Sequence, residues 1–257
     1  MDVGTMDLNS DLGEGFGRWR LGDDDALLRI VTSANVACGF HAGDALTMRR
    51  VCDWALDRGI AVGAQVGYRD LAGFGRRRID YELVELRDEI IYQIAALEGF
   101  CRLQGDRVRY VKPHGALYNT AAVDVWQASA IVAAIVDYDR SLAVLCSAGS
   151  ILARSAEHAG LRVVAEGFAD RAYLADGRLV PRSETGSVIS DPRRVVERVL
   201  RMASAGEVMA VDGTVLQLPV ESICLHGDTP GAVELATLVR AALLEAGIKP
   251  APFTPLR

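Results

Sequence analysis

The sequence predicts an α/β fold in which parallel strands alternate with helices. Two observations predict it: short β-rich runs recur along the whole chain, and most are followed by a stretch with helical periodicity. The 257 residues are 50% hydrophobic and 24% charged, a balance that excludes disordered, fibrous and disulfide-scaffold proteins. No linker or repeat divides the chain, so we expect a single domain over residues 1–257.

The expected strands are short runs rich in β-branched and other apolar residues. Their apolar runs are mixed and not very long, so a closed barrel and an open sheet fit the pattern equally well. A segment with Asp212-Gly213 at its centre, Val208–Leu216, predicts a small inserted β-hairpin. The seven strands are Met6–Asn9, Ala34–Cys38, Ile60–Ala64, Val108–Val111, Leu142–Cys146, Leu161–Ala165 and Ser222–Leu225.

The expected helices carry apolar residues every three or four positions and begin or end at capping residues. The first, Asp44–Arg58, turns Leu46 inward and ends at Gly59. The second, Asp80–Gln104, begins at a capping Asp80 and carries one apolar stripe. The other four are Val125–Tyr138, Ser150–His158, Pro192–Ala203 and Gly231–Ala246.

The charge balance and the apolar runs exclude several classes of protein. The chain has 28 basic and 34 acidic residues and a net charge of −6, so nothing draws it to nucleic acid or to an anionic membrane. The longest apolar stretch, Ala130–Val136, is far shorter than the roughly 18 residues of a membrane span. The N-terminus does not resemble a signal peptide, and five Cys without a CxxC pair fit reduced thiols. We therefore expect a cytoplasmic protein that binds neither nucleic acid nor a membrane.

Polar side chains gather where the expected strands end. Because parallel strands end at the same edge of a sheet or barrel, we expect these side chains to form one active site. Arg182 lies in the long loop after the sixth strand and suits the binding of a carboxylate or phosphate. The residues that end or follow a strand are Asn9, Asp11, Glu14, Asn35, His41, Asp44, Gln65, Lys112, His114, Tyr118, Asn119, Glu166, Asp170, Arg171, His226 and Asp228.

Two short segments pair an imidazole with a carboxylate. His41 precedes Asp44 by three residues, and His226 precedes Asp228 by two. Such a pair can orient a general base or supply two metal ligands. The alternative in each case is a histidine that braces the loop before the next helix.

Lys112 stands out because the chain has one other lysine, Lys249. Pro113 fixes the exit from the fourth strand, so that Lys112 and His114 project into the same space. A lysine there can bind a carboxylate or phosphate, or polarise a carbonyl. The alternative is a lysine whose charged end reaches the surface.

Six segments, in order along the chain, resemble the LamB/YcsF family. They are DLNSDLGE (7–14), SANVACGFHAGD (33–44), VKPHGALYN (111–119), EGFADRAY (166–173), LVPR (179–182) and CLHGD (224–228). The resemblance implies an irregular seven-stranded (β/α) barrel similar to the glycoside hydrolase/deacetylase superfamily. It also implies the opening of 5-oxo-L-proline to L-glutamate with ATP as co-substrate, in a 5-oxoprolinase whose partners are subunits B and C. The ATP site is not located by the sequence, and a homo-oligomer is also possible.

The reaction that the resemblance implies suggests a role for each group of residues at the strand ends. A lactam is a stable amide, so phosphorylation of its carbonyl oxygen would activate it for attack by water. We expect Lys112 with Arg171 or Arg182 to hold the substrate carboxylate or phosphate. Asp11 or Asp44, with His41, would activate the water, and His114 or His226 would protonate the leaving nitrogen. The expected substrate-binding residues are Asn9, Glu14, Asn35, Tyr118, Asp170, Arg171, Arg182 and Asp228.

One position departs from the family pattern. The family usually has Gly-Ala-His-Pro after the third strand, whereas this chain has Gln65 in place of that histidine. Related deacetylases bind a metal with an Asp and two His, so Gln65 favours a site without metal, although Asp11, His41 and His114 could still form one. Two other functions remain open: a stand-alone metal-dependent deacetylase or amidohydrolase, and a non-catalytic subunit that binds substrate or a partner.

Overall fold

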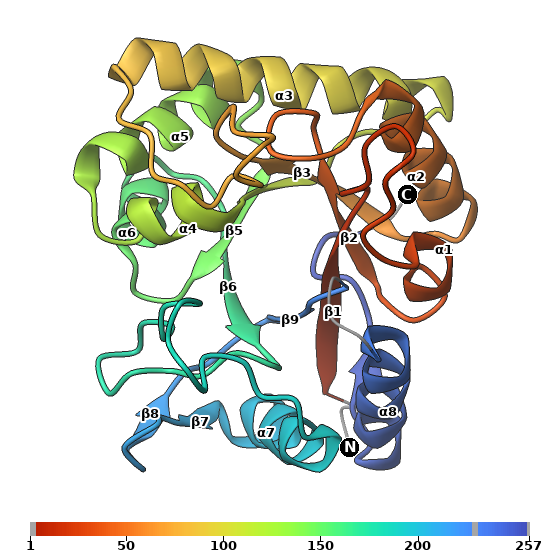
Figure 1. Ribbon diagram of the computed structural model, residues 1–257, viewed down its shortest axis with the longest axis vertical. Coiled ribbons are helices and arrows are strands. Elements are labelled where there is room, and N and C mark those ends of the chain that lie inside the picture. Colours follow the sequence, from red (N-terminus) through yellow and green to blue (C-terminus); the bar gives the residue numbers. More distant parts are fainter. Residues whose placement is uncertain (1–3, 228–230, 256–257) are drawn as a thin grey trace.

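Seven parallel strands close into a ring in the computed structural model, which describes residues 4–227 and 231–255 (Figure 1). The last strand pairs back with the first, Asp7 lying opposite Ser222, so the described strands form a barrel and not an open sheet. The expected seven-stranded barrel is therefore confirmed. In ring order the strands are β1 (Thr5–Leu12), β2 (Ser33–Ala37), β3 (Ala61–Val66), β4 (Tyr110–Pro113), β5 (Ala143–Ser147), β6 (Val163–Phe168) and β9 (Ser222–Leu225).

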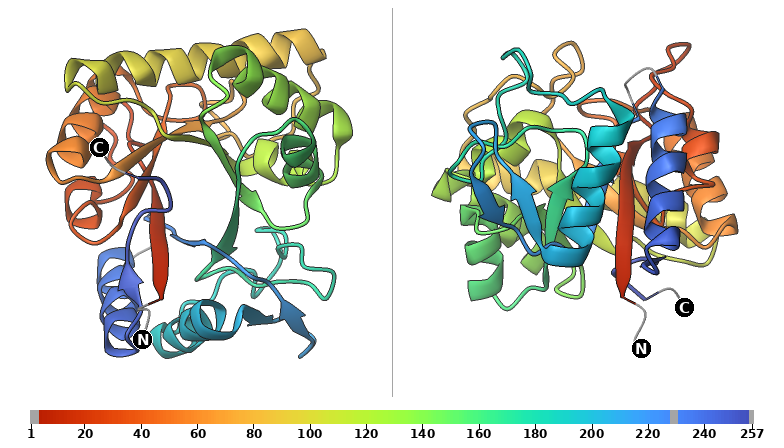
Figure 2. Two further views of the ribbon diagram at one scale, coloured as in Figure 1. Left: turned by 180° about the vertical axis from the view of Figure 1, so that it is seen from behind. Right: turned by 90° about the horizontal axis from the view of Figure 1, so that it is seen from below.

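Helices cover the outside of the barrel, and Figures 1 and 2 show α7 and α8 beside β1. All six expected helices are present. The two shortest, α1 and α4, were not expected, because four and seven residues are too few to show a helical period. The described helices are α1 (Asp24–Leu27), α2 (Ala45–Asp57), α3 (Leu83–Leu103), α4 (Gly115–Ala121), α5 (Val125–Tyr138), α6 (Ile151–His158), α7 (Pro192–Ala205) and α8 (Ala232–Glu245).

The helices of the described residues were compared in length and apolar character with a membrane span. No single helix there has the length and apolar character needed to cross a bilayer. Helices α4 and α5 taken together have the length and composition of a membrane span, but the chain bends by 108° between them.

Two expected details of the helices are wrong. Leu46 is 74% exposed, because the buried face of α2 runs through Thr47, Met48 and Val51 and leaves position 46 outside it. Helix α3 begins at Leu83 and not at Asp80, whose carboxylate instead accepts a hydrogen bond from Arg78.

The small hairpin and one short strand lie outside the barrel ring. The hairpin consists of β7 (Glu207–Met209) and β8 (Val215–Gln217), antiparallel as expected. Its turn contains Gly213 with φ +90°, a conformation that favours glycine. The short strand β10 (Lys249–Pro250) pairs with the start of β1.

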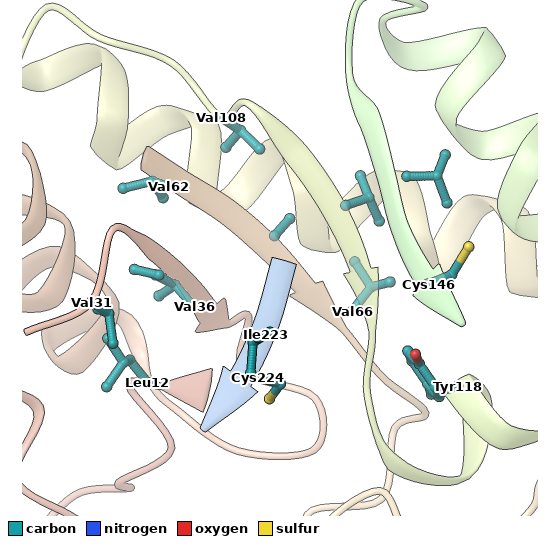
Figure 3. Close-up of a cluster of buried hydrophobic side chains, with 14 of the residues drawn as sticks. Leu12, Val31, Val36, Val62, Val66, Val108, Tyr118, Cys146, Ile223 and Cys224 are labelled. Carbon is teal, nitrogen blue, oxygen red and sulfur yellow. The ribbon is translucent and has the colours of Figure 1, made fainter. Parts of the chain in front are cut away.

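Alternate residues of each strand face either the helices or the barrel interior. On β1, Leu8 and Leu12 are fully buried in the apolar core under the helices, where Figure 3 shows Leu12 together with Val36 and Val62. The intervening residues of β1 point into the barrel, whose interior is polar towards the carboxyl ends of the strands. Tyr110, Leu145 and neighbouring apolar side chains fill part of the interior as a second cluster. The barrel interior thus explains the polar residues Asp7, Asn9 and Asp11, whereas Ser10 lies on the other face and donates its hydroxyl hydrogen to the carbonyl oxygen of Leu225.

Candidate active site

The carboxyl ends of the strands open into a cavity of about 1080 Å³. Side chains from β1, β4, the loop after β6 and the end of β9 meet there, as expected for a parallel barrel. The structure therefore brings together residues that are far apart in the sequence. The predicted site residues that line the cavity are Asp11, Glu14, Lys112, His114, Tyr118, Arg171, Arg182 and His226.

Lys112 lies at the base of the cavity and is 2% exposed. Its Nζ is 2.7 Å from Glu166 Oε1 and 3.1 Å from Asp11 Oδ1, and it donates a hydrogen bond to Asn9 Oδ1. Burial alone would lower the pKa of Lys112, but Asp11, Cys224 and Glu166 together raise it well above its ordinary value. Lys112 is therefore a buried ammonium held between two carboxyl groups.

Asp11 is held in one orientation by the barrel interior. Asn35 donates its Nδ2 hydrogens to Asp11 Oδ1 at 2.8 Å and to Asn9 Oδ1 at 2.7 Å, and Tyr110 donates its hydroxyl hydrogen to Asn35 Oδ1 at 2.7 Å. The Tyr110 hydroxyl thus fixes which end of the Asn35 amide faces Asp11. Burial raises the pKa of Asp11, but the charge of Lys112, together with the two nearby histidines and the Asn35 hydrogen bond, outweighs burial and leaves the pKa below its ordinary value.

We expect Tyr110→Phe to lower the free energy of unfolding by about 1–3 kcal/mol, because it leaves the buried Asn35 Oδ1 without a donor. Urea denaturation measures this change. Tyr92→Phe is the matched control, since Tyr92 is 63% exposed on α3 and the same change there should be within about 0.5 kcal/mol of neutral. If the two variants were equally stable, the hydroxyl of Tyr110 would not hold the amide.

His114 and His41 form a buried stack, with 3.9 Å between ring centroids and 8° between ring planes. His114 Nε2 lies 3.0 Å from the carbonyl oxygen of Phe74, which can only accept, so Nε2 carries the proton. His41 Nε2 lies 3.2 Å from Gln65 Oε1. Burial lowers the pKa of His114 to about 4 and that of His41 well below its ordinary value. Both rings are therefore neutral at pH 7.

The unprotonated Nδ1 of His114 lies 3.6 Å from Glu14 Oε1. Phe74, which holds the opposite nitrogen, has φ +55°, a strained conformation for a bulky side chain. Its ring also meets the His114 ring edge-on at 5.2 Å. The loop around Phe74 is thus shaped to fix His114 with an unprotonated nitrogen near Glu14.

Glu14, His41 and His114 are also the described residues that come nearest to a metal site. One ligand atom from each lies within 4.8 Å of the others, so Glu14 takes the place that was expected of Asp11. An imidazole binds a metal in the plane of its ring, whereas these two rings are parallel and stacked. Their Nδ1 lone pairs cannot converge on one ion in this arrangement. The residues present therefore do not fit a metal, and the absence of one stays a prediction.

We expect protein purified without chelator to contain substoichiometric metal by elemental analysis. Added Zn²⁺ should leave the melting temperature unchanged, because only an ion that binds the folded state stabilises it. His41→Ala is the control for adventitious binding. One equivalent of metal in the wild type that is lost in His41→Ala would show that the rings turn to bind an ion.

His226 is paired with Asp170 and stacked on Phe168. Its Nδ1 lies 2.8 Å from Asp170 Oδ1, and its ring centroid is 5.8 Å from that of Phe168. Burial raises the pKa of Asp170, but the charge and hydrogen bond of His226, together with the charge of Arg182, leave it below its ordinary value. Asp170 therefore orients His226 and leaves Nε2 for another partner. The expected partner, Asp228, lies outside the described residues.

Asp44 does not reach the cavity, so its expected role beside His41 is not supported. Its carboxylate accepts hydrogen bonds from the backbone N–H of Thr47 at 2.8 Å, as the N-cap of α2, and of Gly17 at 2.6 Å. The local pattern of a helix start thus explains this residue.

The remaining predicted residues differ in how directly they face the cavity. Asn9 and Asn35 are fully buried in the barrel, where Asn9 accepts a hydrogen bond from Lys112 and Asn35 donates one to Asp11. Tyr118 lines the cavity wall, with its hydroxyl 3.1 Å from Ser147 Oγ.

Glu166 was expected after the sixth strand, but the sequence assigned it no catalytic or binding role. It is 1% exposed at the end of β6 and contacts Lys112. A carboxylate inside an otherwise apolar buried strand was the available signal, because such a group is almost never buried without a partner.

Comparison with known proteins gives a consistent result. The model of the LamB/YcsF family matches residues 6–257. A Mycobacterium avium (strain 104) protein, named as the A subunit of 5-oxoprolinase, is 59% identical over 244 residues, covering 95% of this chain and 97% of that protein. A protein of the same name from Streptomyces avermitilis is 59% identical over 248 residues, covering 96% and 99%.

Two solved structures are similar to this chain. The lactam utilization protein from Thermus thermophilus has a TM-score of 0.92 and 41% identity, covering 97% of this chain and 100% of that one. A family 4 carbohydrate esterase from Streptomyces lividans has a TM-score of 0.51 and 12% identity, covering 98% and 94%. The second likeness concerns the fold alone.

Proposed function

The chain belongs to the LamB/YcsF family, and we propose on that basis that it is the A subunit of an ATP-dependent 5-oxoprolinase, a cytoplasmic hydrolase that opens 5-oxo-L-proline to L-glutamate. Relatives with that name at 59% identity support the proposal. The observation that carries it is the arrangement of a buried ammonium, Lys112, and a neutral imidazole, His114, in one cavity.

The reaction requires an activated lactam. Transfer of the γ-phosphoryl group of ATP to the lactam oxygen gives an imidoyl phosphate and ADP. Water then adds to the ring carbon, the carbon–nitrogen bond breaks as the nitrogen takes up a proton, and γ-glutamyl phosphate forms. A second water releases phosphate and leaves glutamate. We assign the addition of water and the ring opening to this chain, with subunits B and C as its partners.

The side chains of the cavity match these steps. His114 Nδ1 is unprotonated and can accept a proton from the attacking water, with Glu14 beside it. The Lys112 ammonium stabilises negative charge that develops on the substrate, and Asp11 and Glu166 keep it protonated. We assign the protonation of the leaving nitrogen to His226, whose Nδ1 is held by Asp170.

Reconstitution tests this proposal. The chain is mixed with its candidate subunits B and C, 5-oxo-L-proline and ATP, and glutamate is measured with each component omitted in turn. We expect glutamate to form only when ATP and all three subunits are present. Full activity of B and C without this chain, or ATP-independent opening by this chain alone, would contradict the proposal.

A further inference from the structure

We propose that residues 70–77, between β3 and α3, form a loop that positions the base His114. Asp70 and Arg77 close this loop, and the carbonyl oxygen of Phe74 carries its effect to the imidazole. The loop thereby selects the tautomer of His114 whose Nδ1 is unprotonated. This inference rests on the proposed function, which gives that nitrogen the task of accepting a proton from water, and it adds two positioning residues outside the cavity.

A neutral imidazole has one N–H proton, and two acceptors compete for that of His114. The carbonyl oxygen of Phe74 lies 3.0 Å from Nε2, whereas Glu14 Oε1 lies 3.6 Å from Nδ1. A proton on Nδ1 would face the Glu14 carboxylate and leave no lone pair there to accept another proton. The position of the Phe74 carbonyl therefore decides whether His114 can act as a base.

A backbone conformation that is rare for a bulky residue places this carbonyl. Phe74 has φ +55° and the next residue, Gly75, has φ +62°. Their carbonyl oxygens reach one segment, because that of Phe74 meets the His114 ring and that of Gly75 accepts a hydrogen bond from the backbone N–H of Ala116 at 2.9 Å. Glycine at position 74 would be unstrained, but it would lose the phenyl ring that meets His41 and His114 edge-on at 6.0 and 5.2 Å. Such strain persists only where the surrounding structure holds the residue.

Asp70 holds the strained residue from inside the loop and is 5% exposed. Its backbone carbonyl oxygen accepts a hydrogen bond from the backbone N–H of Gly75 at 2.9 Å. Its carboxylate Oδ1 accepts one from the backbone N–H of Gly73, also at 2.9 Å. Asp70 therefore anchors the chain on both sides of Phe74.

Arg77 closes the loop by pairing with the same carboxylate. Its Nε donates to both carboxylate oxygens of Asp70 at 3.1 Å, and its Nη2 donates to Oδ1 as well. The hydrogen bonds from Arg77 are the main cause that holds the pKa of Asp70 below its ordinary value, against the effect of burial. A Cβ at Gly73 would collide with both side chains of the pair, so glycine is required there.

Asp70 and Arg77 are not among the residues that line the cavity, and the Arg77 side chain is 66% exposed. Their effect on a reaction in the cavity must therefore pass through Phe74 to His114. It should appear in the tautomer of His114 and in kcat, and it should leave the binding of substrate unchanged.

NMR spectroscopy of the imidazole nitrogens measures the tautomer in the isolated full chain labelled with ¹⁵N-histidine, and His114→Ala identifies the signals. In the wild type at pH 7 we expect an unprotonated Nδ1 and a protonated Nε2. In Asp70→Asn and Arg77→Gln, part of the population should carry the proton on Nδ1. Asp53→Asn is the matched control, since Asp53 pairs with Arg49 at 3.0 Å on α2 and should keep the wild-type tautomer.

Kinetics of the assembled subunits give a second readout. We expect Asp70→Asn and Arg77→Gln to lower kcat about tenfold, because losing one hydrogen bond shifts the tautomer population by up to that factor and the wrong tautomer is inactive. KM for 5-oxo-L-proline should stay within about twofold of the wild type. Arg77→Gln changes an exposed side chain and serves as the test if Asp70→Asn does not fold.

The inference is overturned by a proton on Nδ1 of His114 in the wild type, by an unchanged tautomer in the folded variants, or by kcat values equal to that of Asp53→Asn. The two proposals fail separately. A changed tautomer in the variants, with no glutamate formed by the wild-type assembly, would remove the proposed function and leave the positioning of His114 by the loop. Glutamate formation with an unchanged tautomer in the variants would do the opposite.

Discussion

Lys112→Met is expected to lower kcat/KM of the assembled 5-oxoprolinase at least about 10²-fold, because it removes a fixed positive charge from a site that water reaches poorly. The same change should lower the free energy of unfolding by about 3–5 kcal/mol, since it leaves buried carboxyl groups without a counter-charge. Methionine has an unbranched side chain one atom shorter than that of lysine, and it removes the charge. Steady-state kinetics and urea denaturation measure the two effects.

Two further variants separate the catalytic effect from the structural one. Lys249→Met changes the other lysine, which is exposed, and should leave both quantities unchanged. In Lys112→Met with Glu166→Gln, the neutral glutamine removes one of the two buried charges, so we expect part of the stability to return without the activity. A double variant that recovered activity along with stability would show that Lys112 is needed only for folding.

Much of the fold could be predicted from local patterns. Helix α5 and strand β9 have the predicted bounds, because their apolar runs lie between clear turn and capping signals. Closure of the barrel could not be predicted from composition or periodicity, since it depends on the pairing of Asp7 with Ser222, which are far apart in the sequence. The family resemblance, and not the strand pattern, favoured the closed form.

For the candidate site, the sequence predicted which residues lie together but not which of them contact one another. Because parallel strands end at the same edge, the sequence predicted that Asp11, Lys112 and His226 lie together, and all three line the cavity. It did not identify their partners. The carboxylate that orients His226 belongs to Asp170, in the loop after β6. Asp44 is the N-cap of α2. A short His–Asp spacing in the sequence does not show whether the carboxylate holds the histidine or caps a helix.

His114→Ala is expected to lower kcat of the assembled enzyme by about 10²–10⁴-fold, the usual contribution of a general base. On the acid side of the wild-type pH profile, activity should fall only as the pH drops through about 4, where His114 becomes protonated. A base with an ordinary histidine pKa of 6.5 would instead lose activity near neutral pH. The cavity also has room for exogenous imidazole, which should restore part of the activity of His114→Ala.

The stability of this variant gives a second readout that does not depend on turnover. The pKa of His114 is lower in the folded chain, about 4, than its ordinary value of 6.5, so the unfolded chain binds more protons between these two pH values. His114 therefore makes the wild type lose stability as the pH falls from 6.5 towards 4, and His114→Ala should lose less over that range. His158→Ala, at the exposed end of α6, is the control and should match the wild type in activity and in pH dependence. Near-normal turnover in folded His114→Ala, or a wild-type profile that falls through about pH 6.5 as the pH is lowered, would assign the water-activating step to another residue.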